Sequence, residues 1–297
     1  MWHSDKLAVQ DELCDKYSNI LHGMDQKNPG YQLLYVRAFF RTMSREWNGV
    51  DQYRINKYMR LVRFVLRQSL VCFSKNGELD SLFSVLTEEG LGPIDWKTGN
   101  INNVPLGLKY HFVDIWIEEW KNLKFGLDIM NETDFIEFDW KPESFNSRFI
   151  DDESTWQMMR PWVIVILRTK LDFYRNRVYE DIFEILLEEA DCSVDMIKSA
   201  PGLDEDEVKS MVNTPRLQLK FEFLANRIMS CCNGKVEIDA PIKQTNRNRA
   251  YKLINRLREV AMDHVPIPES TPDLSQYSES WNYKKKLQQN GEFQAKT

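Results

Sequence analysis

Apolar side chains between positions 33 and 47 recur every three or four residues, the spacing that places them on one side of an α-helix. They are Leu33, Val36, Phe39, Phe40, Met43 and Trp47. Arg37, Arg41 and Arg45 form a second row on the opposite side. We expect this helix to end at Asn48-Gly49 in the left-handed conformation, and Asp51 to cap the helix that follows.

The next segment repeats this division into an apolar and a basic face. The apolar face carries Ile55, Met59, Val62, Leu66 and Phe73. The other face carries Lys57, Arg60, Arg63 and Arg67, and Arg54 lies off that row. Two amphipathic helices joined by a short turn pack antiparallel. The pattern therefore predicts a helical hairpin with an apolar inside and a basic outside.

Helical spacing returns in the rest of the chain. The segments are Leu79 to Leu86, a helix from about Pro105, a buried helix starting at Pro161, Pro215 to Cys232 and Asn246 to Asp263. The β-branched run from Val163 to Ile166 would also suit a strand, but no partner strand appears nearby and the flanking spacing is helical. Residues 128–153 mix acidic and aromatic side chains without a period and are expected to form an irregular acidic loop.

Successive antiparallel helices without a strand pattern predict an all-α fold. We expect the hairpins to stack as an irregular HEAT/armadillo-like solenoid, with a compact irregular helical domain as the alternative, because the sequence has no strict period. Residues 1–263 are predicted to form this single helical-repeat domain. Residues 264–297 combine proline, serine and charge without an apolar period and are expected to be a disordered tail.

The composition is that of a globular protein, and the sequence contains few candidate catalytic residues. Hydrophobic residues make up 42% of the 297, and five cysteines have no metal-binding or disulfide spacing. No signal pattern or membrane-length apolar run is present, so we expect a soluble intracellular protein with no membrane contact. His111 and Asp114 share a helix face but lack convergent partners. We therefore expect no enzymatic activity, metal, cofactor or small-molecule substrate.

Charge is the more informative feature. The net charge is −6, yet basic rows flank acidic blocks at residues 114–153 and 180–207. Such rows suit RNA phosphates or acidic protein segments, although charged helix faces can also be simply solvated. Because no aromatic residue interleaves the rows, folded RNA backbone or protein fits better than single-strand stacking. The candidate contacts are Arg37, Arg41, Arg45, Arg54, Lys57, Arg60, Arg63, Arg67, Arg247, Arg249, Lys252 and Arg256.

Four segments of the chain are distinctive: WHSDK, AFFRTMSREWNGVDQYRINKYMRLVRFVLRQS, VPLGLKYHFVDIWIEEW, and RTK followed by VYEDIFEILLEE. In this order they resemble the ribosomal RNA processing protein 1 family of nucleolar proteins. The most specific matching positions are Arg45, Glu46, Trp47, Gly49, Asp51, Arg54 and Lys57, whereas Asn56 stands where the family often has Asp. Trp47 is expected to anchor the core of the hairpin and Gly49 to form its turn.

The resemblance implies a helical-repeat scaffold in the nucleus and nucleolus. It further implies a non-catalytic role in precursor rRNA processing within pre-60S particles, alongside other nucleolar assembly factors, with possible contacts to the rRNA backbone. Family members usually carry a further helical segment before the first motif and many have a long basic tail, of which Lys284 to Lys286 are the trace here. A protein-binding adaptor of helical repeats with no ribosomal role is the alternative.

Overall fold

The computed structural model describes residues 3–24, 29–92, 104–125, 152–191, 217, 219–234 and 242–263. Helices account for most of these residues, and none of them lies in a strand. The α-helices are α1 (Leu7–Gly23), α2 (Pro29–Glu46), α3 (Ile55–Lys75), α4 (Leu79–Glu89), α5 (Leu106–Phe125), α6 (Asp152–Arg168), α7 (Asp172–Val178), α8 (Ile185–Asp191), α11 (Phe221–Cys232) and α12 (Gln244–Asp263). A 3₁₀ turn, η1 (Trp47–Gly49), follows α2, and a π-helical stretch, η3 (Tyr179–Glu184), joins α7 to α8.

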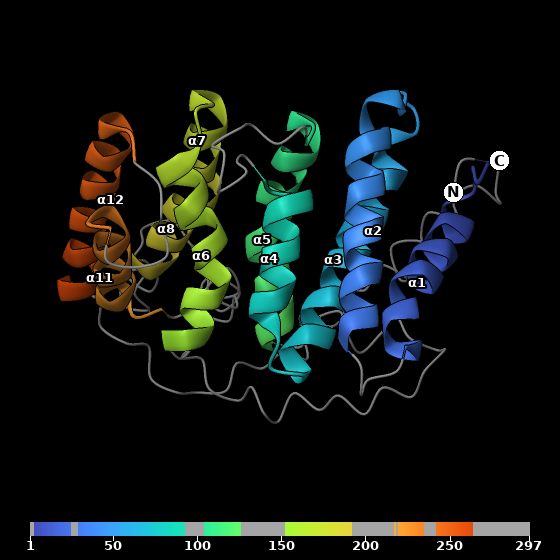
Figure 1. Ribbon diagram of the computed structural model, residues 1–297, viewed down its shortest axis with the longest axis horizontal. Coiled ribbons are helices and arrows are strands. Elements are labelled where there is room, and N and C mark those ends of the chain that lie inside the picture. Colours follow the sequence, from blue (N-terminus) through green and yellow to red (C-terminus); the bar gives the residue numbers. More distant parts are fainter. Residues whose placement is uncertain are drawn as a thin grey trace, which may run out of the picture.

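The helices stand side by side in a row that runs from α1 at one end to α11 and α12 at the other (Figure 1). Helices two apart in the sequence contact one another, so that α1, α3, α5 and α7 follow in one layer and α2, α4 and α6 in the other. At the far end α11 packs against α6 and α12. The predicted all-α fold of helical repeats is confirmed.

Aromatic side chains hold the middle of the array together. The Trp116 ring on α5 meets the edge of Trp162 on α6 at a centroid distance of 5.2 Å, and Phe83 on α4 lies 5.7 Å from Trp116. Trp116 and Trp162 are fully buried. One tryptophan therefore joins helices of both layers, which explains why α5 is apolar around most of its circumference.

The predicted pairing of the first basic helices is wrong in one respect. Although η1 and a short turn join α2 to α3, α3 packs mainly against α1 and α5, and α2 packs mainly against α4. All residues from Phe64 to Phe73 are buried. Because neighbouring helices cover this part of α3, it has no solvent-exposed basic face there. The helix is therefore a central element of the array and not half of an isolated hairpin.

The turns and helix ends agree only in part with those predicted from the sequence. The Asp51 carboxylate accepts the backbone N–H groups of Tyr53 and Arg54 at 3.0 Å and so orders the turn before α3, but the N-cap position of α3 is Arg54, which has no side-chain cap. Gly234 has a φ of 68° and ends α11 as expected. Gly49 does not adopt the left-handed conformation, because the chain leaves α2 through the 3₁₀ turn η1.

Trp47 is buried in η1, as expected of a core anchor. A Cβ atom at Gly107 would lie only 3.0 Å from the indole Nε1 of Trp47. The first turn of α5 therefore approaches this tryptophan closely because residue 107 has no side chain.

Helix boundaries differ from the prediction most clearly at α6. This helix begins at Asp152, so Pro161 lies inside it and does not start it. Trp156 and Met159 are buried and supply the apolar face of the earlier turns. The last two positions of the expected acidic loop are thus helical, whereas residues 128–151 and the expected tail, 264–297, lie outside the described residues.

Candidate partner-binding surfaces

The arginines of α2 face the end of α4. Arg37 pairs with Glu88 and, at 3.3 Å, with Glu89, and Arg41 lies 2.5 Å from Glu89. Arg45 lies 2.6 Å from its sequence neighbour Glu46, and both of these side chains are exposed. Arg37 and Arg41 therefore tie α2 to α4, while Arg45 projects to solvent.

The row on α3 contacts both neighbouring helices of its layer. Arg60 lies 2.6 Å from Asp11 on α1. Arg67 lies 2.7 Å and Arg63 2.5 Å from Glu119 on α5. Burial alone would raise the pKa of Glu119, but the charges and hydrogen bonds of Arg67 and Arg63 lower it below the ordinary value. The carboxyl group therefore remains ionised inside the protein.

Two of the predicted surface cations are not at the surface. Lys57 is 6% exposed and donates a hydrogen bond to the Ser4 carbonyl at 3.1 Å, and Arg67 is 4% exposed. Arg54 pairs with Asp51 of the preceding turn. The expectation that the whole α3 row faces outward is therefore wrong, because α1 and α5 cover the side on which these two residues lie.

The candidates on α12 lie at the opposite end of the array from those on α2 (Figure 1). Arg249 donates a hydrogen bond to the Asn176 side chain of α7, and Arg256 pairs with Glu184 of η3. Lys252 is exposed between them, and Arg247 is half-buried. Arg249, Lys252 and Arg256 border a groove of about 340 Å³ that Tyr179 and Leu253 also line.

The twelve candidates thus form separate groups and no single patch. The α2 and α3 groups contact Asp11, Glu88, Glu89, Glu118 and Glu119 on neighbouring helices. The sequence analysis places Glu118 and Glu119 in an acidic block and assigns no role to Asp11, Glu88 or Glu89. Only Glu118 and Glu119 lie in a block that is acidic in the sequence, so the charge pattern alone does not predict these pairs. They form because the fold places carboxylates and guanidinium groups on adjacent helices, where opposite charges attract.

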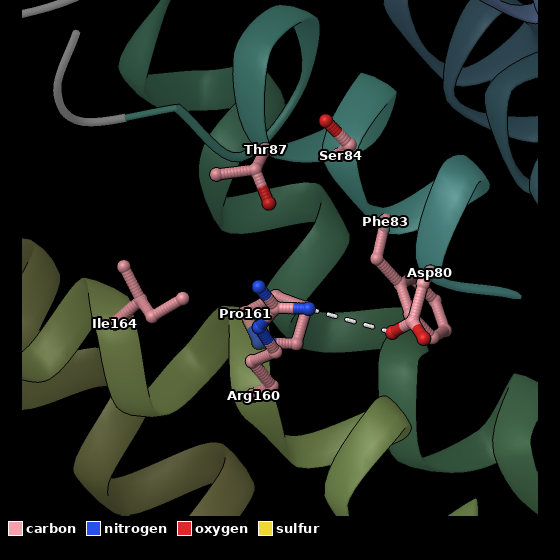
Figure 2. Close-up of a pocket in the computed structure, with 7 residues that line it drawn as sticks. All are labelled: Asp80, Phe83, Ser84, Thr87, Arg160, Pro161 and Ile164. Atoms are coloured by element: carbon pink, nitrogen blue, oxygen red, sulfur yellow. Dashed lines mark hydrogen bonds and ion pairs between the residues drawn. The ribbon is translucent and has the colours of Figure 1, made fainter. Parts of the chain in front are cut away.

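A second, polar groove lies between α4 and α6. It has a volume of about 210 Å³ and is bordered by Asp80, Phe83, Ser84, Thr87, Arg160, Pro161 and Ile164. Figure 2 shows Arg160 reaching across to Asp80, and the two side chains lie 3.4 Å apart. An ion pair therefore spans this groove and joins α4 to α6, as ion pairs also join α2 to α4 and α3 to α5.

Lys109 is a buried cation that sequence reasoning missed. It is 1% exposed, and its ammonium group lies 5.7 Å from the centre of the Tyr174 ring. Burial lowers the pKa of Lys109 to about 8. Within the described residues it has no acidic partner, so its position on α5 contributes a contact to an aromatic ring and no ion pair.

The remaining candidate chemistry has structural roles. One ring nitrogen of His111 lies 2.7 Å from the Met59 carbonyl, and Asp114 pairs with Arg177 at 2.8 Å. Cysteines 14, 72, 231 and 232 are buried free thiols. Across the part of the chain that the structure describes, no cluster of potential metal ligands occurs, and no helix has the length and apolar character that crossing a membrane requires.

Comparison with known families decides the membership of this chain. The model of the nucleolar protein family Nop52 matches residues 1–254. The chain belongs to the Nop52 family. The match extends across the array from α1 into α12, so it covers both ends at which candidate contacts lie.

The chain is also similar, at modest sequence identity, to curated proteins named as ribosomal RNA processing protein 1 homologues. Ribosomal RNA processing protein 1 homolog A of Homo sapiens is 25% identical, over 91% of this chain and 62% of its own length. Homolog B of Homo sapiens is 35% identical over 40% of this chain and 15% of its own length. The homolog of Dictyostelium discoideum is 23% identical over 91% of this chain and 53% of its own length. This Nop52-family chain thus spans less than two thirds of each relative.

Proposed function

We propose that this protein is a non-catalytic scaffold in ribosome biogenesis, required for processing of precursor rRNA within pre-60S particles in the nucleolus. The observation that carries the proposal is the family match over residues 1–254 together with relatives named for ribosomal RNA processing. The array supports such a role, because stacked helical repeats present a long surface on which several partners bind at once.

The candidate cations divide into two roles under this proposal. Those held by neighbouring helices, above all Lys57, Arg63 and Arg67, keep the repeats in position. Those with exposed side chains, namely Arg45, Arg249, Lys252 and Arg256, are available to rRNA phosphates or to acidic segments of other nucleolar assembly factors. The partners lie outside the chain, so the scaffold needs no cofactor or small-molecule substrate.

Sedimentation of a nuclear extract tests the proposal. In cells that express the tagged full chain, we expect a share of it to co-migrate with large-subunit precursors and to leave those fractions after ribonuclease treatment. Depletion of the protein should cause unprocessed large-subunit precursor rRNA to accumulate, and the full chain should reverse this. Recovery only in light fractions, with unchanged precursor levels after depletion, would show that the protein is an adaptor without a ribosomal role.

A further inference from the structure

The corner between α6 and α7 is fixed against the first turns of α12. The Asn246 side chain is fully buried and donates hydrogen bonds to the carbonyl groups of Leu167 at 3.0 Å and Thr169 at 3.1 Å. Its side-chain oxygen accepts a hydrogen bond from Arg175. Because both amide atoms are engaged with the same corner, the start of α12 and the α6–α7 connection form one rigid surface.

Four cations at this corner have no acidic partner among the described residues. Arg168 is the last residue of α6, Lys170 lies in the α6–α7 connection, Lys243 directly precedes α12, and Arg247 lies in its first turn. The acid of this neighbourhood, Asp172, lies 2.5 Å from Arg175. This corner differs from the α2 and α3 rows, whose arginines are paired with carboxylates on neighbouring helices.

An aromatic side chain projects from the same corner. Phe173, in the first turn of α7, is 82% exposed. An exposed aromatic ring can stack on an unpaired base, and this ring lies in the same stretch of chain as Arg168 and Lys170. The basic rows of the sequence contain no such aromatic residue, because Phe173 lies outside them. Phe173 lies three positions after Lys170, and its neighbour Asp172 pairs with Arg175, which donates a hydrogen bond to Asn246 of α12.

We propose that this corner binds single-stranded RNA, with Arg168, Lys170, Lys243 and Arg247 at the phosphates and an unpaired base stacked on Phe173. Positive side chains hold the backbone without regard to sequence, and an exposed ring accepts any unstacked base. A duplex is disfavoured, since its bases are stacked on one another and leave no face for Phe173. The inference rests on the proposed function, in which precursor rRNA is the source of the strand.

Binding of a fluorescent single-stranded RNA to the full chain tests the role of Phe173. In the Phe173→Ala variant we expect the affinity to fall about tenfold, while the dependence of affinity on salt concentration stays the same. Tyr53→Ala is the matched control, because Tyr53 is 86% exposed near the other end of the array and should bind RNA as the unaltered protein does. Unaltered affinity of the Phe173→Ala variant would overturn the proposal, as would equal affinity for duplex and single strand.

The salt dependence of RNA affinity tests whether the cations contact phosphates. The double variant Lys170→Gln, Lys243→Gln should lower the slope of log affinity against log salt concentration by about 1.4, which is roughly 0.7 for each single-strand phosphate contact. Lys6→Gln at the α1 end should leave the slope unchanged. Unfolding midpoints establish that all variants are folded, and an unchanged slope in the double variant contradicts the site.

This outcome is separable from that of the proposed function. If the protein sediments with large-subunit precursors but the corner variants bind RNA normally, the corner is wrong and the scaffold role stands. If the corner binds RNA as described but the protein stays in light fractions, the RNA-binding site stands and the proposed scaffold role is wrong.

Discussion

Replacing Glu119 with glutamine is expected to lower the free energy of unfolding by about 3–5 kcal/mol. The side chain of Glu119 is fully buried, and that of Arg67, which is 5% exposed, holds it together with Arg63. The neutral amide would remove the carboxylate that compensates the buried guanidinium group of Arg67, while Arg63 would keep its ion pair with Glu118. Urea unfolding of the two proteins at pH 7 measures the difference.

Glu118→Gln is the control, because among the described residues Glu118 forms an ion pair with Arg63 alone, and its side chain is 30% exposed. Its loss should be about 1 kcal/mol or less. The pKa of Glu119 is lowered in the folded state, so its contribution is present at neutral pH and disappears as the pH falls below the ordinary value of about 4.3. The two proteins should therefore converge in acid. Equal effects of the two substitutions at pH 7 would show that the buried cluster does not stabilise the array.

Replacing Trp116 with alanine should cost about 3–5 kcal/mol of unfolding free energy. The indole contacts Trp162 and Phe83, so its removal leaves a cavity between α4, α5 and α6 that rigid neighbours cannot fill. The change should appear as a lower midpoint in thermal or urea unfolding.

Leu34→Ala provides the comparison for this loss, since Leu34 is an exposed apolar residue of α2. Its effect should lie within about 0.5 kcal/mol. A loss below 1 kcal/mol for Trp116→Ala would mean that the two layers are not joined through this residue.

Most of the helices were predictable from the sequence because they have an apolar stripe with the period of an α-helix, whereas α1 was not predicted. Their packing partners were not, since the period fixes which face is buried and leaves open which helix covers it. Arg37 and Glu89 are 52 positions apart, and only the stacking of α2 on α4 brings them together. The basic rows were therefore correctly located along the chain, whereas their neutralisation by neighbouring helices could not be derived.

Two local errors have a different cause. Pro161 was taken as a helix start because proline suits the first turn, but the buried Trp156 and Met159 extend α6 past it in the N-terminal direction. Gly49 was expected in the left-handed conformation, but the chain forms η1 there instead. In both cases packing of neighbouring aromatic or apolar side chains overrode a local preference.

The question of why an acidic protein gathers arginines on α2 and α3 has a structural answer. Paired with acids on α1, α4 and α5, these arginines connect successive repeats, and a partly buried pair of this kind is sensitive to the loss of either member. Among the described residues, Arg168, Lys170, Lys243 and Arg247 at the corner of α6, α7 and α12 have no acidic partner. The ion pairs thus separate the arginines that stabilise the array from the cations that we propose to meet RNA.

Ultraviolet crosslinking of single-stranded RNA to the full chain, followed by mass spectrometry of the attached peptides, tests this separation most directly. The account predicts crosslinks in the peptide that contains Phe173 and in the peptide that spans Lys243 to Arg249. Crosslinks confined to α2 and α3, with none at the corner, would contradict it.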